Sequence, residues 1–189
     1  MNTATPDIVL WESFRKGDKE AFATLFRQHY ETLYRYGSKF TGNAAQLEDT
    51  IQELFLELWQ AKSRTPVVSI RAYLLKSLKY KLIKDFRRKG RLISLTVSPD
   101  ISFEWSHEHF LIAEQESAER KEAVLNALAR LSNRQKEIIY LKYYQNLSYE
   151  EVSEIMNINY QVARNLLYQA IKSLKSMLAG AMIFFLLHP

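Results

Sequence analysis

The stretch that decides the fold runs from Leu131 to Leu178 and reads LSNRQKEIIYLKYYQNLSYEEVSEIMNINYQVARNLLYQAIKSLKSML. Ser132 stands three residues before Gln135, and Ser148 stands at the same spacing before Glu151. At this spacing the serine side chain accepts a hydrogen bond from a backbone N–H of the first helical turn, and the Gln or Glu side chain accepts one from the backbone N–H of the serine. The sequence therefore predicts two helix starts within this stretch.

The second of these starts predicts a short helix over Tyr149–Met156, then a break, and then a longer helix from Tyr160. Asn157 stands where a left-handed residue is needed, since asparagine adopts positive φ more readily than most residues. Asn159 is a good N-cap for the helix that follows. A short helix, a tight turn and a second helix describe a helix-turn-helix.

The longer helix of this pair has an inner and an outer face. Its apolar residues repeat at helical spacing and should face inward: Ala163, Leu167, Ala170, Ile171 and Leu174. The outer face carries residue types that can contact base edges and phosphates in a DNA major groove. These candidate DNA-binding residues are Tyr160, Gln161, Arg164, Asn165, Tyr168 and Lys172. On this pattern alone, a helical bundle with a merely solvated outer face is an equal alternative.

The whole chain has 189 residues, no cysteine, 47% hydrophobic residues and few glycines or prolines. This composition is typical of a soluble, mostly helical protein of one or two domains, and it excludes a disulfide framework. Acidic residues interrupt any apolar run near the start, so no signal peptide is expected, and no apolar run is long enough to cross a bilayer. We therefore expect a cytoplasmic protein.

The charges are distributed in blocks around a net charge of +5. Residues 70–91 are strongly basic, with Asp85 as their single acid, whereas residues 99–122 are mostly acidic. Opposite charge blocks favour separate surfaces for separate partners.

The N-terminal part predicts three helices before the basic block. The first covers Ile8–Lys16, the second runs from Lys19 to about Phe40, and the third covers Ala44–Lys62. Gly17 should end the first helix, Asp18 should cap the second, and Asn43 should cap the third. The apolar face of the second helix also contains His29, which is expected to be a core residue. Acids on the third helix are either an ordinary solvated surface or a docking face for a basic partner.

The basic block predicts a fourth helix from Ile70 to about Lys89, capped by Ser69 and preceded by a loop over residues 63–69. Its inner line is Leu74, Leu78, Leu82 and Phe86. Tyr73 and Tyr80 lie among the basic residues of the other faces. Such a surface suits single-stranded or melting DNA, because cations follow the phosphates and rings stack on unpaired bases. A solvated basic face is the alternative.

Residues from Leu95 to about Glu114 have no helical period, and a run of that length inside one compact domain is unusual. We therefore expect an all-α protein with two small helical domains, over residues 1–93 and 117–189, joined by a flexible linker over residues 94–116. The second domain contains the helix-turn-helix. The apolar tail Ala181–Leu187 is expected to pack against that domain, with a regulator or protease contact as the alternative.

With these elements in order, the chain resembles the extracytoplasmic-function group of the sigma-70 family. Ala21-Phe22 with Leu25-Phe26 and Tyr30, then LEDTIQELFLELW and IRAYLLKSLKYKLIKDFRRKGR, are similar to the second conserved region of that family. The block Leu128–Leu178 is similar to the fourth region. Departures from the family pattern are Asn157 and Asn159, where Gly and Ser are frequent, and Leu166, where Arg is frequent.

The resemblance implies an alternative sigma factor that binds core RNA polymerase, directs it to specific promoters and assists DNA melting in transcription initiation. It implies polymerase binding by Asp49, Gln52 and Glu53, and upstream-element reading by the helix-turn-helix. The residues implied in minus-ten binding and melting are Arg71, Tyr73, Lys76, Lys79, Tyr80, Lys84, Arg87 and Arg88. Implied partners are core RNA polymerase, promoter DNA and a membrane-anchored anti-sigma factor, with no small-molecule substrate.

The linker length fits this interpretation only when polymerase takes part. Promoter elements separated by about 17–20 base pairs lie about 60 Å apart at about 3.4 Å per step. A flexible linker of about twenty residues averages about 25 Å end to end, although its extended limit is about 70 Å. Strong promoter recognition should therefore require the core enzyme.

Two other classes of function remain as alternatives. An ordinary helix-turn-helix regulator would bind DNA without polymerase, but it would leave the acidic helix and the basic helix without a role. An enzyme is disfavoured because the four histidines lack helical ligand spacing, cysteine is absent and no glycine-rich phosphate loop is present. No catalytic residue, metal or cofactor is therefore expected.

Overall fold

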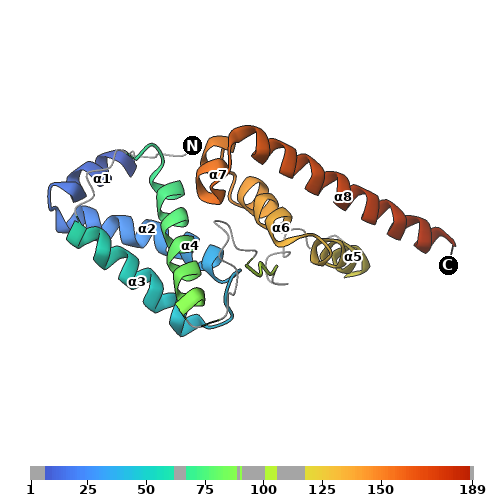
Figure 1. Ribbon diagram of the computed structural model, residues 1–189, viewed down its shortest axis with the longest axis horizontal. Helices are drawn as coiled ribbons and strands as arrows, with labels where there is room; N and C mark the ends of the chain where they lie inside the picture. The colour runs from blue at the N-terminus through green and yellow to red at the C-terminus, as the bar shows by residue number, and fades with distance from the viewer. Residues whose placement is uncertain (1–6, 62–66, 89, 91–100, 106–117, 188–189) are drawn as a thin grey trace. The chain divides into compact units, whose positions relative to one another are not determined.

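The computed structural model describes residues 7–61, 67–88, 90, 101–105 and 118–187, with the backbone alone described over 118–121 and 180–187. The regular structure of these residues is entirely helical (Figure 1). The chain divides into two compact units, Met1–Pro99 and Asp100–Pro189. The predicted all-α class is confirmed.

The first unit contains four described helices. They are α1 (Asp7–Arg15), α2 (Lys19–Gly37), α3 (Ala44–Ala61) and α4 (Ile70–Arg88). Their predicted caps are present. The Asp18 carboxylate accepts hydrogen bonds from two backbone N–H groups at the start of α2, at 2.8 and 3.2 Å. Asn43 Oδ1 accepts from the Gln46 N–H at the start of α3 at 3.0 Å, and Ser69 Oγ accepts from the Ala72 N–H at the start of α4 at 3.2 Å. Local side-chain chemistry therefore sets where these helices begin.

The end of α2 differs from the prediction. The helix ends at Gly37 rather than near Phe40, because the N–H groups of Lys39 and Phe40 bond three residues back, to Tyr36 and Gly37, at 3.1 and 3.0 Å. This tighter pattern is common in the last turn of a helix. It brings Phe40 edge-on against Tyr36, with ring centroids 5.0 Å apart.

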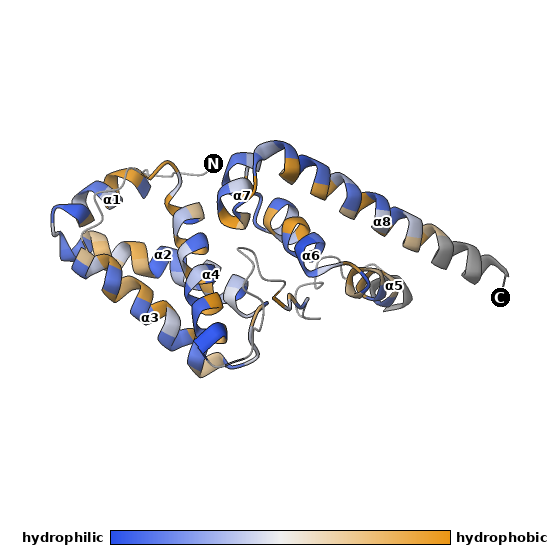
Figure 2. Ribbon diagram, viewed as in Figure 1, coloured by the Kyte–Doolittle hydropathy of each residue, from blue (hydrophilic) through white to orange (hydrophobic). Residues whose placement is uncertain are grey.

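The core of the first unit lies between these helices and is rich in aromatic rings. Figure 2 shows hydrophobic and hydrophilic residues alternating along each helix of this unit. The predicted inner line of α4 is buried, as is His29 on α2. The apolar residues of α3 recur at helical spacing and are buried: Leu47, Ile51, Leu54, Phe55 and Leu58. Trp59 of the same stripe is half-buried and packs on Phe14 and Phe22. Helical periodicity therefore predicted the inner faces correctly.

The second unit contains the predicted helix-turn-helix. Its helices are α5 (Ala118–Ala129), α6 (Asn133–Ile139), a π-helical turn η2 (Tyr140–Tyr144), α7 (Tyr149–Met156) and α8 (Tyr160–Leu187). Both capping boxes, at Ser132 and Ser148, are complete. Asn157 is left-handed, with φ 51° and ψ 52°, and Asn159 Oδ1 accepts from the Val162 N–H at 2.8 Å. The turn between α7 and α8 is thus built as predicted.

The π-helical turn was not predicted, since the sequence indicated only the helix starts at Ser132 and Ser148. Its backbone closes through the Gln145 N–H, which donates to the Tyr140 carbonyl five residues earlier at 2.9 Å. The Gln145 amide also donates to the Tyr140 hydroxyl at 2.9 Å, and both residues are buried. The Tyr140 and Tyr144 rings stack at 4.9 Å. These contacts within the turn therefore stabilise its π-helical backbone.

Part of the predicted linker packs onto the second unit. Ile101 and Phe103 are buried, and the Phe103 N–H donates to Asn133 Oδ1 at 3.1 Å. The Phe103 ring also packs edge-on against Tyr140, with centroids 5.6 Å apart. The rest of the linker, and with it the predicted boundaries at 93/94 and 116/117, lies outside the described residues, so those boundaries stay a prediction. Helix α8 continues to Leu187, and the packing of its tail side chains also lies outside the description.

Candidate nucleic-acid and protein interfaces

The helix-turn-helix presents one polar surface on α8. All six predicted DNA-binding side chains are exposed: Tyr160, Gln161, Arg164, Asn165, Tyr168 and Lys172. The opposite face is fixed by Ala163, Leu167 and Ala170, which are buried against the rest of the unit. Gln161 and Asn165 are joined, because the Gln161 amide donates to Asn165 Oδ1 at 3.1 Å. The outer face therefore offers two aromatic rings, two cations and a pair of amides to a partner.

An acidic surface runs along α3. Asp49, Gln52 and Glu53 are all exposed on this helix, as the polymerase-binding prediction requires. Leu56 belongs to the same face, because positions 49, 52, 53 and 56 follow the i, i+3, i+4, i+7 spacing of one helical stripe. It is 56% exposed. Sequence reasoning missed Leu56, although an apolar residue lying off the inner stripe of an amphipathic helix is a signal that could have found it.

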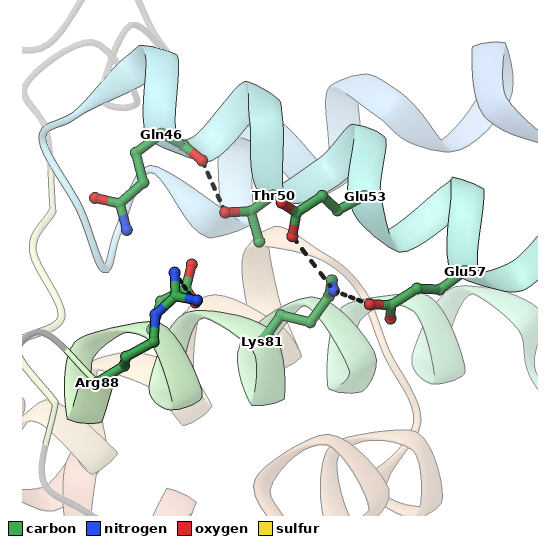
Figure 3. A network of polar contacts seen from close by, with 7 residues as sticks. Gln46, Thr50, Glu53, Glu57, Lys81 and Arg88 are labelled. Atoms are coloured by element: carbon green, nitrogen blue, oxygen red, sulfur yellow. Dashed lines mark hydrogen bonds and ion pairs between the residues drawn. The ribbon is translucent and has the colours of Figure 1, made fainter.

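A lysine of the basic helix faces this acidic surface instead of solvent. Lys81 Nζ lies 2.7 Å from Glu57 Oε1 and 3.7 Å from Glu53 Oε2, and Figure 3 shows its side chain between the two carboxylates. The Lys81 side chain is largely buried between the helices, whereas both glutamates are mostly exposed. The contact ties α4 to α3 and leaves Lys81 out of the basic outer surface.

The predicted minus-ten residues of α4 fall into two groups. Five are exposed: Lys76, Tyr80, Lys84, Arg87 and Arg88. Arg71, Tyr73 and Lys79 are half-buried. The Tyr73 ring packs edge-on against Trp11 of α1 at 5.6 Å, whereas Tyr80 is 68% exposed. Of the two predicted stacking rings, Tyr80 is the one that is free to meet a base.

His29 is a core residue, as predicted. Its Nε2 is 3.4 Å from Asp7 Oδ2 at the start of α1. Burial lowers the pKa of His29, the nearby Asp7 carboxylate opposes that shift, and the Arg71 guanidinium adds to it. His29 therefore connects α1, α2 and α4 and is shielded from any ligand. The described histidine and carboxylate side chains form no group of three or more that could hold a metal ion.

Family comparison identifies both units. Residues 25–92 match the family described as Sigma-70 region 2, and residues 121–174 match the one described as Sigma-70, region 4. Among curated relatives, the ECF RNA polymerase sigma factor SigL of Mycobacterium tuberculosis is 29% identical over 156 residues, covering 80% of this chain and 85% of the relative. The chain belongs to the extracytoplasmic-function group of the sigma-70 family.

Other members of this sigma group are similar over nearly the whole chain. The ECF RNA polymerase sigma factor SigK of Mycobacterium sp. (strain JLS) is 26% identical over 179 residues, covering 90% of this chain and 89% of the relative. The region 2 match includes α3 and α4, and the region 4 match includes α6, α7 and the first half of α8. The three candidate surfaces of this sigma-70 chain, on α3, α4 and α8, therefore lie inside the matched regions.

Solved structures share the fold. CnrH, in complex with the cytosolic domain of CnrY, superposes with a TM-score of 0.62 at 19% identity, covering 92% of this chain and 97% of that one. The sigma factor RpoE, in complex with the anti-sigma factor NepR from Bartonella quintana, gives a TM-score of 0.58 at 20% identity, covering 84% and 96%. No helix in the described part of this sigma-70 chain is both long enough and apolar enough to cross a bilayer.

Proposed function

We propose that the chain is an alternative sigma factor that binds core RNA polymerase, directs it to a specific set of promoters and assists DNA opening. The observation that carries this function is the presence in one chain of both matched regions, each with an exposed surface of suitable chemistry. The protein supplies binding and positioning and no catalysis of its own, and it acts in the cytoplasm together with polymerase.

The acidic surface of α3 is proposed to bind polymerase. Asp49, Gln52 and Glu53 would contact a basic partner surface, and the exposed Leu56 would add an apolar contact at the same face. An apolar residue among charges is a common arrangement in protein interfaces, where a central apolar contact is surrounded by polar ones. This extends the predicted site by one residue.

The outer surface of α4 is proposed to bind and melt the minus-ten element. Tyr80 is the proposed stacking residue because its ring is exposed, and Lys76, Lys84, Arg87 and Arg88 are the proposed phosphate contacts. Arg71, Tyr73 and Lys79 are half-buried and remain part of the proposed minus-ten surface.

The outer surface of α8 is proposed to read the upstream, minus-thirty-five element. Arg164 and Asn165 have side chains suited to hydrogen bonding with base edges, and Gln161 joins Asn165 in the same patch. Tyr160, Tyr168 and Lys172 extend this surface along the helix. Their exposure along one face supports insertion into a major groove.

An anti-sigma factor is the proposed regulatory partner, and a membrane anchor on that factor is part of the proposal. The support is that related folds occur in complexes of CnrH with a cytosolic domain of CnrY and of RpoE with the anti-sigma factor NepR. Such a partner would cover the polymerase-binding surface of α3. Co-purification of the chain from membrane and soluble fractions tests this point, and recovery with soluble partners only would argue against the anchor.

Reconstituted transcription tests the function. The purified chain is added to core RNA polymerase from the same bacterium on fragmented genomic DNA, and the RNA start sites are sequenced. New start sites that share upstream sequences are expected with the chain and absent with core polymerase alone. Specific DNA binding by the chain without polymerase, together with no new start sites, would favour an ordinary helix-turn-helix regulator instead.

A further inference from the structure

Four side chains from three elements of the second unit form a continuous line of cations and rings. Lys142 Nζ of the π-helical turn lies 4.7 Å from the centre of the Tyr149 ring on α7. The Tyr149 ring packs edge-on against Tyr160, the first residue of α8, with centroids 5.6 Å apart. Arg164 lies over the Tyr160 ring, 5.9 Å from its centre. The line therefore leads from the half-buried Lys142 of the π-helical turn to the proposed DNA-binding surface of α8.

The inner end of this line is held in place. Lys142 is half-buried, and its Nζ also donates to the Leu147 carbonyl at 2.8 Å. Tyr149 is half-buried as well, whereas Tyr160 and Arg164 are exposed. Lys142 lies inside the π-helical turn, whose backbone is stabilised by the contact between Tyr140 and Gln145. The same backbone therefore directs the Lys142 side chain toward Tyr149.

The outer end of the line would be mobile without these contacts. An exposed tyrosine in the first turn of a helix has several staggered rotamers to choose from. An edge-to-face ring pair and a cation over a ring each favour one arrangement by about two- to twelvefold. Arg164 follows Tyr160 by four residues, so it shares that face of α8 and depends on where the Tyr160 ring lies.

We propose that Tyr149 is a positioning residue for recognition of the upstream promoter element. It acts on Tyr160, which in turn sets the direction of the Arg164 guanidinium, and it contacts no base itself. Lys142 supports Tyr149 from behind. This inference rests on the proposed function and adds a specificity role for a residue of α7 that lies outside the predicted DNA-binding set.

The test uses the full chain bound to core polymerase and a pool of duplex promoters randomised in the upstream element. The wild-type holoenzyme first selects its preferred sequence from this pool. Binding is then compared on the selected duplex and on one with that element scrambled. For Tyr149→Leu we expect binding to the selected duplex to fall about three- to tenfold, with little change on the scrambled duplex. Tyr149→Phe keeps the ring and should restore wild-type preference.

A control and a double-mutant cycle separate positioning from a general structural effect. Tyr143→Leu is the matched control, because Tyr143 is a tyrosine of the same unit that is 64% exposed and outside the line. It should leave the preference unchanged. In a Tyr160→Leu background the Tyr149→Leu change should have no further effect, because Tyr149 acts through that ring.

The outcomes distinguish this inference from the proposed function. Should the wild-type holoenzyme select no upstream sequence, the proposed function fails. Should it select one while Tyr149→Leu keeps full preference, or should the Tyr149→Leu and Tyr160→Leu effects simply add, the positioning role is refuted. Should thermal melting show that Tyr149→Leu does not fold, Lys142→Met takes its place. Lys142→Met should then cause a smaller loss of preference for the selected duplex, and this loss should disappear in the Tyr160→Leu background. If the effects of Lys142→Met and Tyr160→Leu simply add, the positioning role is refuted.

Discussion

Replacing Phe103 with alanine tests whether the segment 101–105 is part of the second unit. Phe103 is 1% exposed and packs against Tyr140 at 5.6 Å and Trp105 at 6.5 Å between ring centroids. A residue in a free linker would make no such contacts. The substitution removes the ring but keeps the backbone N–H that donates to Asn133.

The size of the effect follows from burial. A fully buried phenylalanine replaced by alanine costs about 3–5 kcal/mol, through lost transfer free energy and the cavity that remains. The two aromatic pairs account for about 0.5–1.5 kcal/mol each within such a figure. The second unit, Asp100–Pro189, is expected to have a total stability on the order of 5–13 kcal/mol. Phe103→Ala should therefore remove a large part of it and lower the Tm of this unit by about 12 °C or more.

Hydrogen exchange followed by mass spectrometry of peptides is the assay, because it measures opening of each unit separately. We expect faster exchange in α6 and α8 of Phe103→Ala and no change in α2 and α3. Glu104→Ala is the matched control, since Glu104 is the neighbouring residue and is exposed. Surface substitutions typically change the free energy of unfolding by no more than about 0.5 kcal/mol. If Phe103→Ala lowers the free energy of unfolding of the second unit by no more than this, the docking of segment 101–105 is refuted.

Three further predictions concern the proposed interfaces and the buried histidine. Asp49→Ala should weaken association with core polymerase in a pull-down while the melting temperature stays unchanged, and an equal loss in the neighbouring Glu48→Ala would contradict a specific role for Asp49. Arg164→Ala and Asn165→Ala should each weaken upstream-element recognition by about 1–3 kcal/mol per lost base contact, and unchanged run-off transcription from the selected promoter would exclude them. The pKa of His29 is lowered in the folded chain, chiefly by burial, so the unfolded chain binds the proton first and stability should fall as pH drops below about 6.5. Denaturant unfolding at several pH values checks this, and a pH dependence that persists undiminished in His29→Gln would assign it to other groups.

The sequence by itself determined the helix starts, the inner faces and the turn of the helix-turn-helix. Each cap at Asp18, Asn43, Ser132 and Ser148 is a hydrogen bond between residues at most three apart, so its partners can be read from the local sequence. The periodic faces follow from helix geometry in the same local way. Those signals sufficed to place the six exposed residues of α8 and the acidic residues of α3.

Only the tertiary structure decided the features that depend on distant partners. Lys81 turns toward Glu57, 24 residues earlier, and Phe103 bonds to Asn133, 30 residues later. A similar long-range contact packs the half-buried Tyr73 against Trp11, whereas Tyr80 of the same helix is exposed. No local pattern distinguishes these alternatives, because burial and long-range contact set their free energies.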